Sequence, residues 1–495
     1  MIGPSIVDRC LQWRKTIIVV FAVATRLITF GNPILYTDEE FYFAVGRAMV
    51  NGALPFVDIW DRKPVGLFLI YALPASLPGL WGIWAYQAMA LVSVVATSLI
   101  IARLADAAGW HRGSILAGIA YLAWITIAGG QGGQSPVFYN LAVAMAAWMI
   151  IHRESAVTWR APTAMLLLGL AIQIKYTVAL EGAYFGLWLC AREWRTRRSV
   201  SHVIRLGASW AMLALVPTML VMIAYASLGE LQAFVYANFQ SIFSRNSDTR
   251  QQLTGNIGKA LAILLPLVGM ALGARTHARE HVAGARLFLV GWLLAALLAF
   301  AVLPPWTDHY TLSVMLPASV MTAGLLARPA GRRLGIALTI LALLAGQVSL
   351  VIDLRRRGTP EQFAKLARMV GHGPGCLYVY SSTSMLYPAT GRCALSSYVF
   401  PSHLTRDREA GAVGVDQMSE MRSIFAKAPE VVVMGPPYPG ERADIRATAL
   451  SLVARDYKAS GFVLLGRKEV VVYRRIRAQP ATPPSAISSR FSDVF

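Results

Sequence analysis

The chain has 495 residues, of which 56% are hydrophobic and 15% are charged. Ordinary soluble domains contain about 25% charged residues, and a soluble protein of this size could not bury so much apolar surface. The composition therefore excludes a typical soluble enzyme and indicates a polytopic membrane protein. The net charge of +20 does not indicate nucleic-acid binding, because no nucleic-acid-binding motif accompanies it. Such a charge is typical of loops that face anionic lipids.

Apolar stretches recur from the N-terminus to about residue 352. The first, near 16–30, follows Arg14 and Lys15 and is interpreted as an uncleaved membrane helix, because no small-residue cleavage site follows it. Basic residues fill alternate gaps between the later stretches, so the positive-inside rule places these gaps and the N-terminus in the cytoplasm. We therefore expect an α-helical polytopic membrane protein with about eleven transmembrane helices. The later stretches lie near 81–102, 114–129, 137–151, 162–191, 203–227, 258–273, 287–303, 310–327 and 334–352.

The stretch 162–191 is long enough for one helix, but basic residues flank it on both sides. Both flanks should then lie in the cytoplasm, so an even number of crossings must lie between them. We expect two short helices that meet near Lys175. A lysine in such a recess needs a partner, which makes Lys175 a candidate functional residue. A snorkelling lysine in an ordinary loop is the alternative.

The predicted transmembrane domain covers residues 1–352 and includes two long outer segments, 31–80 and 228–257. The second is interpreted as a polar, mobile loop, because loops of this length often act as lids; a plain connector is the alternative. Residues 353–477 are richer in charge and in short alternating runs, which predicts a small α/β domain on the periplasmic side. The tail at 478–495 is predicted to be disordered.

Two features of 353–477 concern its compartment. The arginines at 355–357 favour the cytoplasm, but the alternating charge pattern upstream outweighs them. Cys376 and Cys393 could form a disulfide in an oxidising compartment, which would add about 3 kcal/mol in the chain-entropy model. No Cys or His set at zinc-ligand spacing accompanies them. Strands are expected at 377–380, 431–434, 462–465 and 470–473, and helices near 360–370, 416–427 and 442–456.

The first outer segment contains a motif suited to proton transfer. Thr37 followed by Glu40 has the spacing of a capping box, which predicts that a helix begins here. Asp38 and Glu39 would then lie in the first turn, where the helix dipole favours their ionised forms. Asp38 and Tyr42 would share a face. An ionised carboxylate at this surface could accept a proton from a hydroxyl, and a well-capped interfacial helix is the alternative.

Charged residues also cluster at the end of this segment and before a later helix. Asp58, Asp61, Arg62 and Lys63 lie within six residues, and the two basic side chains could neutralise a phosphate. An interfacial belt of ion pairs is the alternative. His309 precedes the apolar stretch 310–327, where backbone N–H groups already favour anions.

Asp38, Lys63, Lys175 and His309 come from four distant parts of the chain. The predicted topology places all four at the outer surface of the membrane. One carboxylate among phosphate-compatible groups suggests a transfer reaction from a lipid phosphate.

At these residues the chain resembles the GT-C superfamily of membrane glycosyltransferases that use polyprenyl-phosphate sugars. The similarity is to the branch that contains bacterial aminoarabinose transferase and the protein O-mannosyltransferases. Two departures are present: Arg62 separates the acid from Lys63, and the turn 131–136 has no acid where some relatives have a glutamate. The matching motifs are Asp38-Glu39 with Tyr42, Asp61 with Lys63-Pro64, His309-Tyr310, and Lys175 after a Gly-Leu-Ala-x-Gln run.

The resemblance implies an inverting sugar transfer from a polyprenyl phosphate to an envelope lipid, glycan or protein, at the bacterial inner membrane. Asp38 would be the base, and Lys63, Lys175 and His309 would stabilise the leaving phosphate. Glu39 and Tyr42 would orient Asp38 or the sugar, and either Asp58 or Asp61 would be the second functional acid. This scheme needs no metal ion, and use of a divalent metal ion is the alternative.

Other functional classes remain as alternatives. A transporter or lipid flippase would be expected to have internal repeats with paired broken helices, and no clear repeat is present. A non-catalytic scaffold of envelope assembly is the third possibility. The sequence does not indicate which sugar or which acceptor is used.

Overall fold

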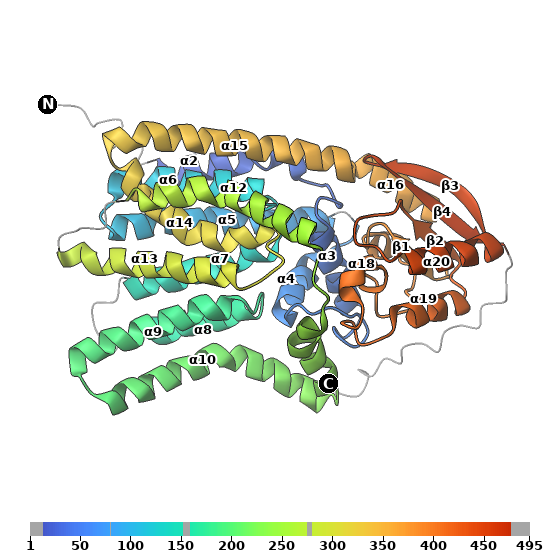
Figure 1. The fold of residues 1–495 in the computed structure, drawn as a ribbon, viewed down its shortest axis with the longest axis horizontal. Helices are drawn as coiled ribbons and strands as arrows, with labels where there is room; N and C mark the ends of the chain where they lie inside the picture. Colours follow the sequence, from blue (N-terminus) through green and yellow to red (C-terminus); the bar gives the residue numbers. More distant parts are fainter. Residues whose placement is uncertain (1–12, 80, 152–158, 275–279, 477–495) are drawn as a thin grey trace.

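The computed structural model describes residues 13–79, 81–151, 159–274 and 280–476. The predicted disordered tail at 478–495 lies outside these residues. Figure 1 shows long, roughly aligned helices at one end of the molecule and a small sheet with short helices at the other. The short helices α3 (Thr37–Val50) and α4 (Val65–Ala75) lie between these two parts.

Five helices among the described residues are long and apolar enough to cross a membrane. Large apolar side chains cover their surfaces; Leu220 and Ile223 of one of them, for example, are each 61% exposed. Such surfaces fit hydrocarbon rather than water. The five are α5 (Trp81–Ala107), α10 (Val200–Ser227), α12 (Arg250–Leu272), α13 (Glu280–Ala301) and α15 (Pro329–Arg357).

Shorter helices complete the bundle. Its core contains large side chains such as Trp124 and Trp292. The helical membrane fold is therefore as predicted. The predicted number of about eleven crossings is not confirmed by the five long helices. The shorter helices are α2 (Arg14–Ala24), α6 (Ser114–Ile127), α7 (Ser135–Ile151), α8 (Arg160–Ile172), α9 (Val178–Arg197) and α14 (Thr311–Leu326).

The stretch 162–191 forms two helices, as the charge pattern predicted. α8 ends at Ile172 and α9 begins at Val178, so Lys175 lies in the connector. The connector packs on α4: the amide of Leu67 donates to the carbonyl oxygen of Gln173 at 3.1 Å. A Cβ on Gly66 would lie 2.6 Å from that oxygen, so only glycine fits there without movement.

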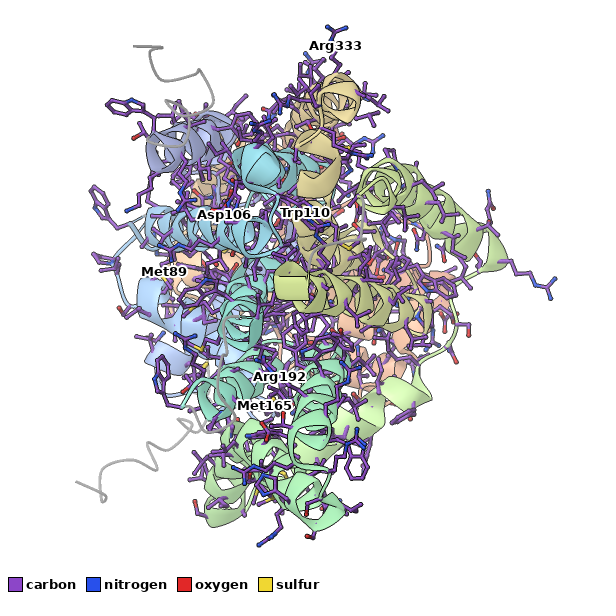
Figure 2. All side chains as sticks on the ribbon, turned by 90° about the vertical axis from the view of Figure 1, so that its left-hand side faces the viewer. Met89, Asp106, Trp110, Met165, Arg192 and Arg333 are labelled. Carbon is purple, nitrogen blue, oxygen red and sulfur yellow. A yellow bond between two sulfur atoms is a disulfide. The ribbon has the colours of Figure 1, made fainter. Side chains whose placement is uncertain are left out.

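Figure 2 views the bundle from the end away from the sheet. Asp106 lies near the end of α5 and pairs with Arg14 at 2.7 Å. Arg192 lies in the second half of α9, which ends at Arg197, and Arg333 lies in the first turn or two of α15. Basic residues therefore gather at the end of the bundle opposite the sheet.

The prediction of a mobile loop at 228–257 is wrong for most of its length. Short helices fill it: α11 (Leu231–Val235), η3 (Tyr236–Gln240) and η4 (Ser241–Ser244), before α12 begins at Arg250. Thr249 caps α12 in a capping box with Gln252. Ion pairs to the C-terminal part hold the segment, as described below.

The C-terminal part contains a four-stranded sheet in the order β1-β2-β4-β3. β1 and β2 are parallel, and the other two pairs are antiparallel. All four expected runs form strands, and the three expected helices are present. The strands are β1 (Leu377–Ser381), β2 (Val431–Met434), β3 (Tyr457–Leu465) and β4 (Lys468–Arg475). The helices are α16 (Pro360–Val370), α17 (Leu386–Thr390), α18 (Pro401–Thr405), α19 (Gln417–Ala426) and α20 (Ala443–Asp456).

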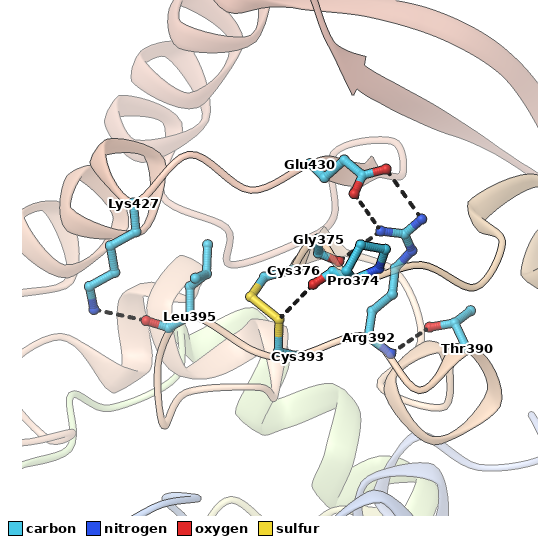
Figure 3. The surroundings of a disulfide bond; sticks show 9 residues. All are labelled: Pro374, Gly375, Cys376, Thr390, Arg392, Cys393, Leu395, Lys427 and Glu430. Atoms are coloured by element: carbon cyan, nitrogen blue, oxygen red, sulfur yellow. Dashed lines mark hydrogen bonds and ion pairs between the residues drawn. A yellow bond between two sulfur atoms is a disulfide. The ribbon is translucent and has the colours of Figure 1, made fainter. Parts of the chain in front are cut away.

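A disulfide joins Cys376, just before β1, to Cys393. Figure 3 shows its surroundings, where Arg392 pairs with Glu430 at 3.2 Å and Lys427 donates to the carbonyl oxygen of Leu395. These links fix the start of β1 to the segment that follows α17.

One hydrophobic core extends from α3 and α4 into the C-terminal part. It contains Phe41 of α3, Leu67 of α4, Phe363 of α16 and Val431 of β2. The helix that carries Asp38 is therefore positioned by the C-terminal part as well as by the bundle.

Candidate active site

α3 begins at Thr37, but the predicted capping box does not form. Tyr36 is the N-cap residue, and no side chain caps the helix. The Thr37 hydroxyl instead accepts a hydrogen bond from the guanidinium of Arg357, at the end of α15, at 2.5 Å. Further along α3, a Cβ on Gly46 would lie 2.7 Å from the backbone of Tyr71, so α3 and α4 are in close contact there.

Asp38 lies in the first turn of α3 and is partly exposed. Burial alone would raise the pKa of its carboxyl, but Lys63, His309 and the amide of Gln134 lower that pKa below its usual value. Lys175 acts in the same direction. The structure thus brings Asp38, Lys63, Lys175 and His309 into one cluster, with Asp38 ionised.

Lys63 lies between acids and an aromatic ring. Its ammonium is 3.3 Å from the Asp61 carboxylate and 5.0 Å from the centre of the Tyr42 ring. Burial would lower the pKa of Lys63, but Asp61 and Asp38 raise it above its usual value. Lys63 is therefore a cation that its ion pair with Asp61 fixes beside Asp38.

Lys175 approaches the same cluster from the connector between α8 and α9. Its ammonium lies 4.2 Å from the centre of the Tyr310 ring. The His309 ring packs edge-on against Tyr310 at 4.8 Å, and its Nδ1 is 3.7 Å from the Asp308 carboxylate. Tyr42 and Tyr310 thus each support one of the two lysines by a cation–π contact.

Two predicted residues lie elsewhere. The Asp58 carboxylate accepts a hydrogen bond from the backbone amide of Leu54 at 2.7 Å, so it stabilises a turn. Arg62 points to the C-terminal part and pairs with Glu409 at 2.7 Å. Asp61, rather than Asp58, is therefore the acid next to Lys63.

Arg62 belongs to an ion-pair network that ties the outer segments to the C-terminal part. Glu409 also pairs with Arg245, and Asp248 pairs with Arg408 at 2.9 Å. Burial would raise the pKa of Glu409, but Arg62 and Arg245 hold it well below its usual range. We call these five residues the outer ion-pair network.

Glu39 is fully buried, behind Asp38 in the first turn of α3. Burial outweighs the favourable Gly133 amide and, with the charge of Asp38, raises the pKa of Glu39 to about 8. Glu39 is therefore a neutral acid at pH 7. It faces the turn after α6, where a Cβ on Gly132 would lie 2.3 Å from its carboxylate.

Two residues of the site were missed by sequence reasoning. Gln134 was noted only as part of a turn without an acid, yet its amide favours the ionised form of Asp38. His403 of α18 is 3% exposed; its Nε2 lies 3.8 Å from Asp61, and its ring packs edge-on against Trp60 at 4.7 Å. Burial lowers the pKa of His403 to about 3, so it is neutral. No local pattern marks either residue.

Two solved structures are similar to this chain. ArnT from Cupriavidus metallidurans, bound to undecaprenyl phosphate, is 15% identical with a TM-score of 0.64, over 93% of this chain and 97% of that one. The oligosaccharyltransferase from Archaeoglobus fulgidus, tethered to an acceptor peptide, is 10% identical with a TM-score of 0.50, over 86% and 68%. No protein-family model and no curated protein matches the sequence. The chain therefore has the fold that the resemblance implied.

Proposed function

We propose that this chain, which has the GT-C fold, is an inverting glycosyltransferase that uses a polyprenyl-phosphate sugar. The observation that carries the proposal is the gathering of Lys63, Lys175 and His309 around the ionised Asp38. An anionic base among cations suits a reaction that removes a proton and releases a phosphate. The undecaprenyl phosphate bound to ArnT supports a donor of this kind.

In the proposed reaction, an acceptor hydroxyl attacks the anomeric carbon of the donor sugar. The new oxygen–carbon bond forms as the bond from that carbon to the phosphate oxygen breaks. The proton goes to the Asp38 carboxylate, and the electron pair of the broken bond stays on the lipid phosphate. Lys63 and Lys175 stabilise this charge, because fixed cations need no rearrangement as it develops. A single displacement of this kind inverts the anomeric centre.

The supporting residues keep the two lysines and Asp38 in place. Tyr42 and Tyr310 contact the ammonium groups of Lys63 and Lys175. Asp61 forms an ion pair with Lys63. Glu39, as a buried neutral acid, fills the space behind Asp38 without adding a second negative charge.

We propose further that the site faces the periplasm of a bacterial inner membrane. Eleven helices of the described chain would cross: α2, α5 to α10 and α12 to α15. An odd number of crossings would put the N-terminus and residues 353–477 on opposite sides, and the positive-inside rule favours the cytoplasm for the N-terminus and the basic end of the bundle. Residues 353–477 would then be a periplasmic domain, and the Cys376–Cys393 disulfide fits an oxidising compartment. The acceptor would be an envelope lipid, glycan or protein.

Mass spectrometry of envelope glycolipids, glycans and proteins, from cells with and without the chain, tests this function. We expect a mass difference of one sugar on one acceptor class. Asp38→Asn should reduce this product about a thousandfold, because a general base contributes about 10²–10⁴. The exposed Asp444→Asn on α20 is the matched control. A product unaffected by Asp38→Asn would favour a scaffold or a flippase.

A further inference from the structure

A cavity of about 250 Å³ lies between α3, the end of α15 and the C-terminal sheet. Its floor is formed by the residues that follow β1 and β2, at the carboxyl ends of these two parallel strands. Ligands of open α/β sheets bind at such strand ends. Figure 1 shows why three parts of the chain meet here: α15 runs the length of the bundle and leads into α16 beside the sheet, close to α3. We call it the sheet-end cavity.

Three cations line the sheet-end cavity: Arg356, Arg357 and Lys468. Within the described residues, no carboxylate lies within ion-pair distance of any of them. Arg357 is held by its hydrogen bond to Thr37 and lies over the Tyr36 ring at 5.6 Å. Arg356 and Lys468 are exposed. Glu40 and Asp353 interact electrostatically with these cations without forming ion pairs, so three positive charges around one cavity favour an anionic ligand.

The cavity also offers groups that an anion alone would not use. Glu40 is 5% exposed and lines the cavity beside the Thr383 hydroxyl. The Ser382 hydroxyl is buried and has no hydrogen-bond partner. The unpaired Ser382 hydroxyl, in the same cavity as a carboxylate that can accept further hydrogen bonds, favours a ligand with hydroxyl groups of its own, because a buried polar group left unpaired is costly. A neutral sugar would leave the cations unused, and inorganic phosphate would offer no sugar hydroxyls to Glu40 and Ser382.

The sheet-end cavity is separate from the reaction centre but shares a helix with it. α3 contributes Thr37 and Glu40 to the cavity and Asp38 to the reaction centre. Neither Lys63 nor Lys175 lines the cavity. Less than one helical turn therefore separates the two sites along α3.

We propose that the sheet-end cavity binds a saccharide unit that carries a phosphate or carboxylate, next to the acceptor hydroxyl. Arg356 and Lys468 bind the anionic group, and Glu40 and Ser382 bind the sugar hydroxyls. The role as an acceptor subsite rests on the proposed function, but binding of an acidic sugar does not. The acceptor class is thereby an acidic glycan.

Isothermal titration calorimetry on the full chain in detergent tests the site. The probes are glucose 6-phosphate and glucuronic acid, with glucose and inorganic phosphate as their matched controls. We expect both acidic sugars to bind at least about tenfold more tightly than either control, because only they engage the cations and Glu40 together. Equal binding of glucose, equal binding of inorganic phosphate, or no binding of the acidic sugars would overturn the proposal.

Substitutions locate the binding in the cavity. Arg356→Gln and Lys468→Gln should each weaken binding of glucose 6-phosphate about tenfold, and Ser382→Ala about threefold. Arg355→Gln and Lys458→Gln remove exposed charges that do not line the cavity, and should leave binding unchanged. Equal losses from both sets would show a general surface-charge effect and overturn the site.

The outcomes also separate the site from the proposed function. If acidic sugars bind but no sugar transfer is detectable, the binding site is supported and the proposed transferase function is contradicted. If the double variant Arg356→Gln with Lys468→Gln transfers sugar with an unchanged KM for the acceptor, the transferase function is supported. The role of the cavity as an acceptor subsite is then contradicted.

Discussion

Individual charges around Asp38 decide whether it can act as a base. Burial disfavours its carboxylate, and Lys63 makes the largest opposing contribution. The lysine in turn depends on Asp61, and His403 of the C-terminal part lies beside this carboxylate with its ring packed against Trp60. A short chain of contacts therefore connects the base to residues that do not touch the substrate.

Lys63→Gln should move the acid limb of kcat/KM to higher pH. With the lysine present, the pKa of Asp38 lies below its usual value, because cations outweigh burial. Removing the largest opposing cation leaves burial dominant, so Asp38 takes up its proton at higher pH. The rate should also fall about a hundredfold from the loss of charge stabilisation. The measurement is a pH profile of sugar transfer.

Lys458→Gln, an exposed change on β3, is the control for this profile. It should keep both the wild-type limb and the wild-type rate. A Lys63→Gln enzyme that is slower but has an unmoved acid limb would contradict a role for Asp38 as the titrating base.

Glu39→Gln should remove a pH dependence of stability. The pKa of Glu39 is raised by burial to about 8, so the native state holds a proton that the unfolded state releases above about pH 4.5. Stability from this group is complete below the unfolded pKa and falls as pH rises through the folded one. Between pH 4.5 and 7 the loss is on the order of 3 kcal/mol. Urea unfolding at a series of pH values measures it.

The glutamine cannot ionise, so Glu39→Gln should gain stability relative to the wild type as the pH increases. Glu469→Gln, at an exposed position on β4, should follow the wild-type curve. Parallel curves for Glu39→Gln and the wild type would mean that Glu39 is not a buried neutral acid.

At the scale of elements, the outer ion-pair network holds η4 and the chain up to Asp248 against the C-terminal part. Glu409→Gln would leave Arg62 and Arg245 buried without their shared carboxylate, which costs about 3–5 kcal/mol. We expect faster hydrogen exchange over 241–249, measured by mass spectrometry. Exchange in α5, which lies inside the bundle, should not change.

Asp444→Asn breaks an exposed ion pair with Arg442 and serves as the control, because exposed pairs contribute little. Unchanged exchange over 241–249 in Glu409→Gln would mean that helix packing alone holds this segment.

The elements that depend on chain-wide patterns could be predicted from the sequence. The break at Lys175 followed from charge alternation, and the strands followed from local alternation of apolar residues. Contacts between distant residues could not be predicted. The Thr37 hydroxyl bonds to Arg357, 320 residues away, in place of its own helix. Arg62 pairs with Glu409, 347 residues away. The charged residues at 58–63 therefore do not act together: Asp61 and Lys63 lie in the candidate site, and Arg62 belongs to the outer ion-pair network.

The candidate site could be predicted to a similar extent. Asp38, Lys63, Lys175 and His309 stand out because charges are rare in apolar surroundings, and the structure brings them together. Gln134 and His403 gave no such signal, because single polar residues are common in turns and short helices. The position of His403 beside Asp61 and Trp60 depends on how the C-terminal part packs on the first outer segment.

At the scale of the whole molecule, the two ends of the bundle differ. One end carries the arginines in the second half of α9 and at the start of α15, and the other carries α3 and the sheet. The orientation of the protein in the membrane can therefore be measured with one reporter at each end.

Cysteines introduced by Arg333→Cys and Lys458→Cys, with Cys10 and Cys190 replaced by serine, report the orientation. A membrane-impermeant maleimide applied to cells with a permeabilised outer membrane should label position 458 and leave position 333 unlabelled, because only the sheet end would face the periplasm. After lysis, both should react. Mass shifts of the purified chain measure the labelling. The reverse pattern would place Asp38 in the cytoplasm and contradict the proposed reaction side.

The length of α15 affects how the protein should respond to the thickness of the bilayer. Its 29 residues form a rod of about 43 Å that touches the bundle along its length and ends at Arg357, which contacts Thr37 of α3. Helices of fixed length tilt when bilayer thickness changes, and a small rotation of a rod this long displaces its tip. The acyl-chain length of the host lipid should thus shift Arg357 relative to Thr37 on α3, the helix that carries Asp38, so turnover in thin and thick bilayers would differ even with every side chain intact.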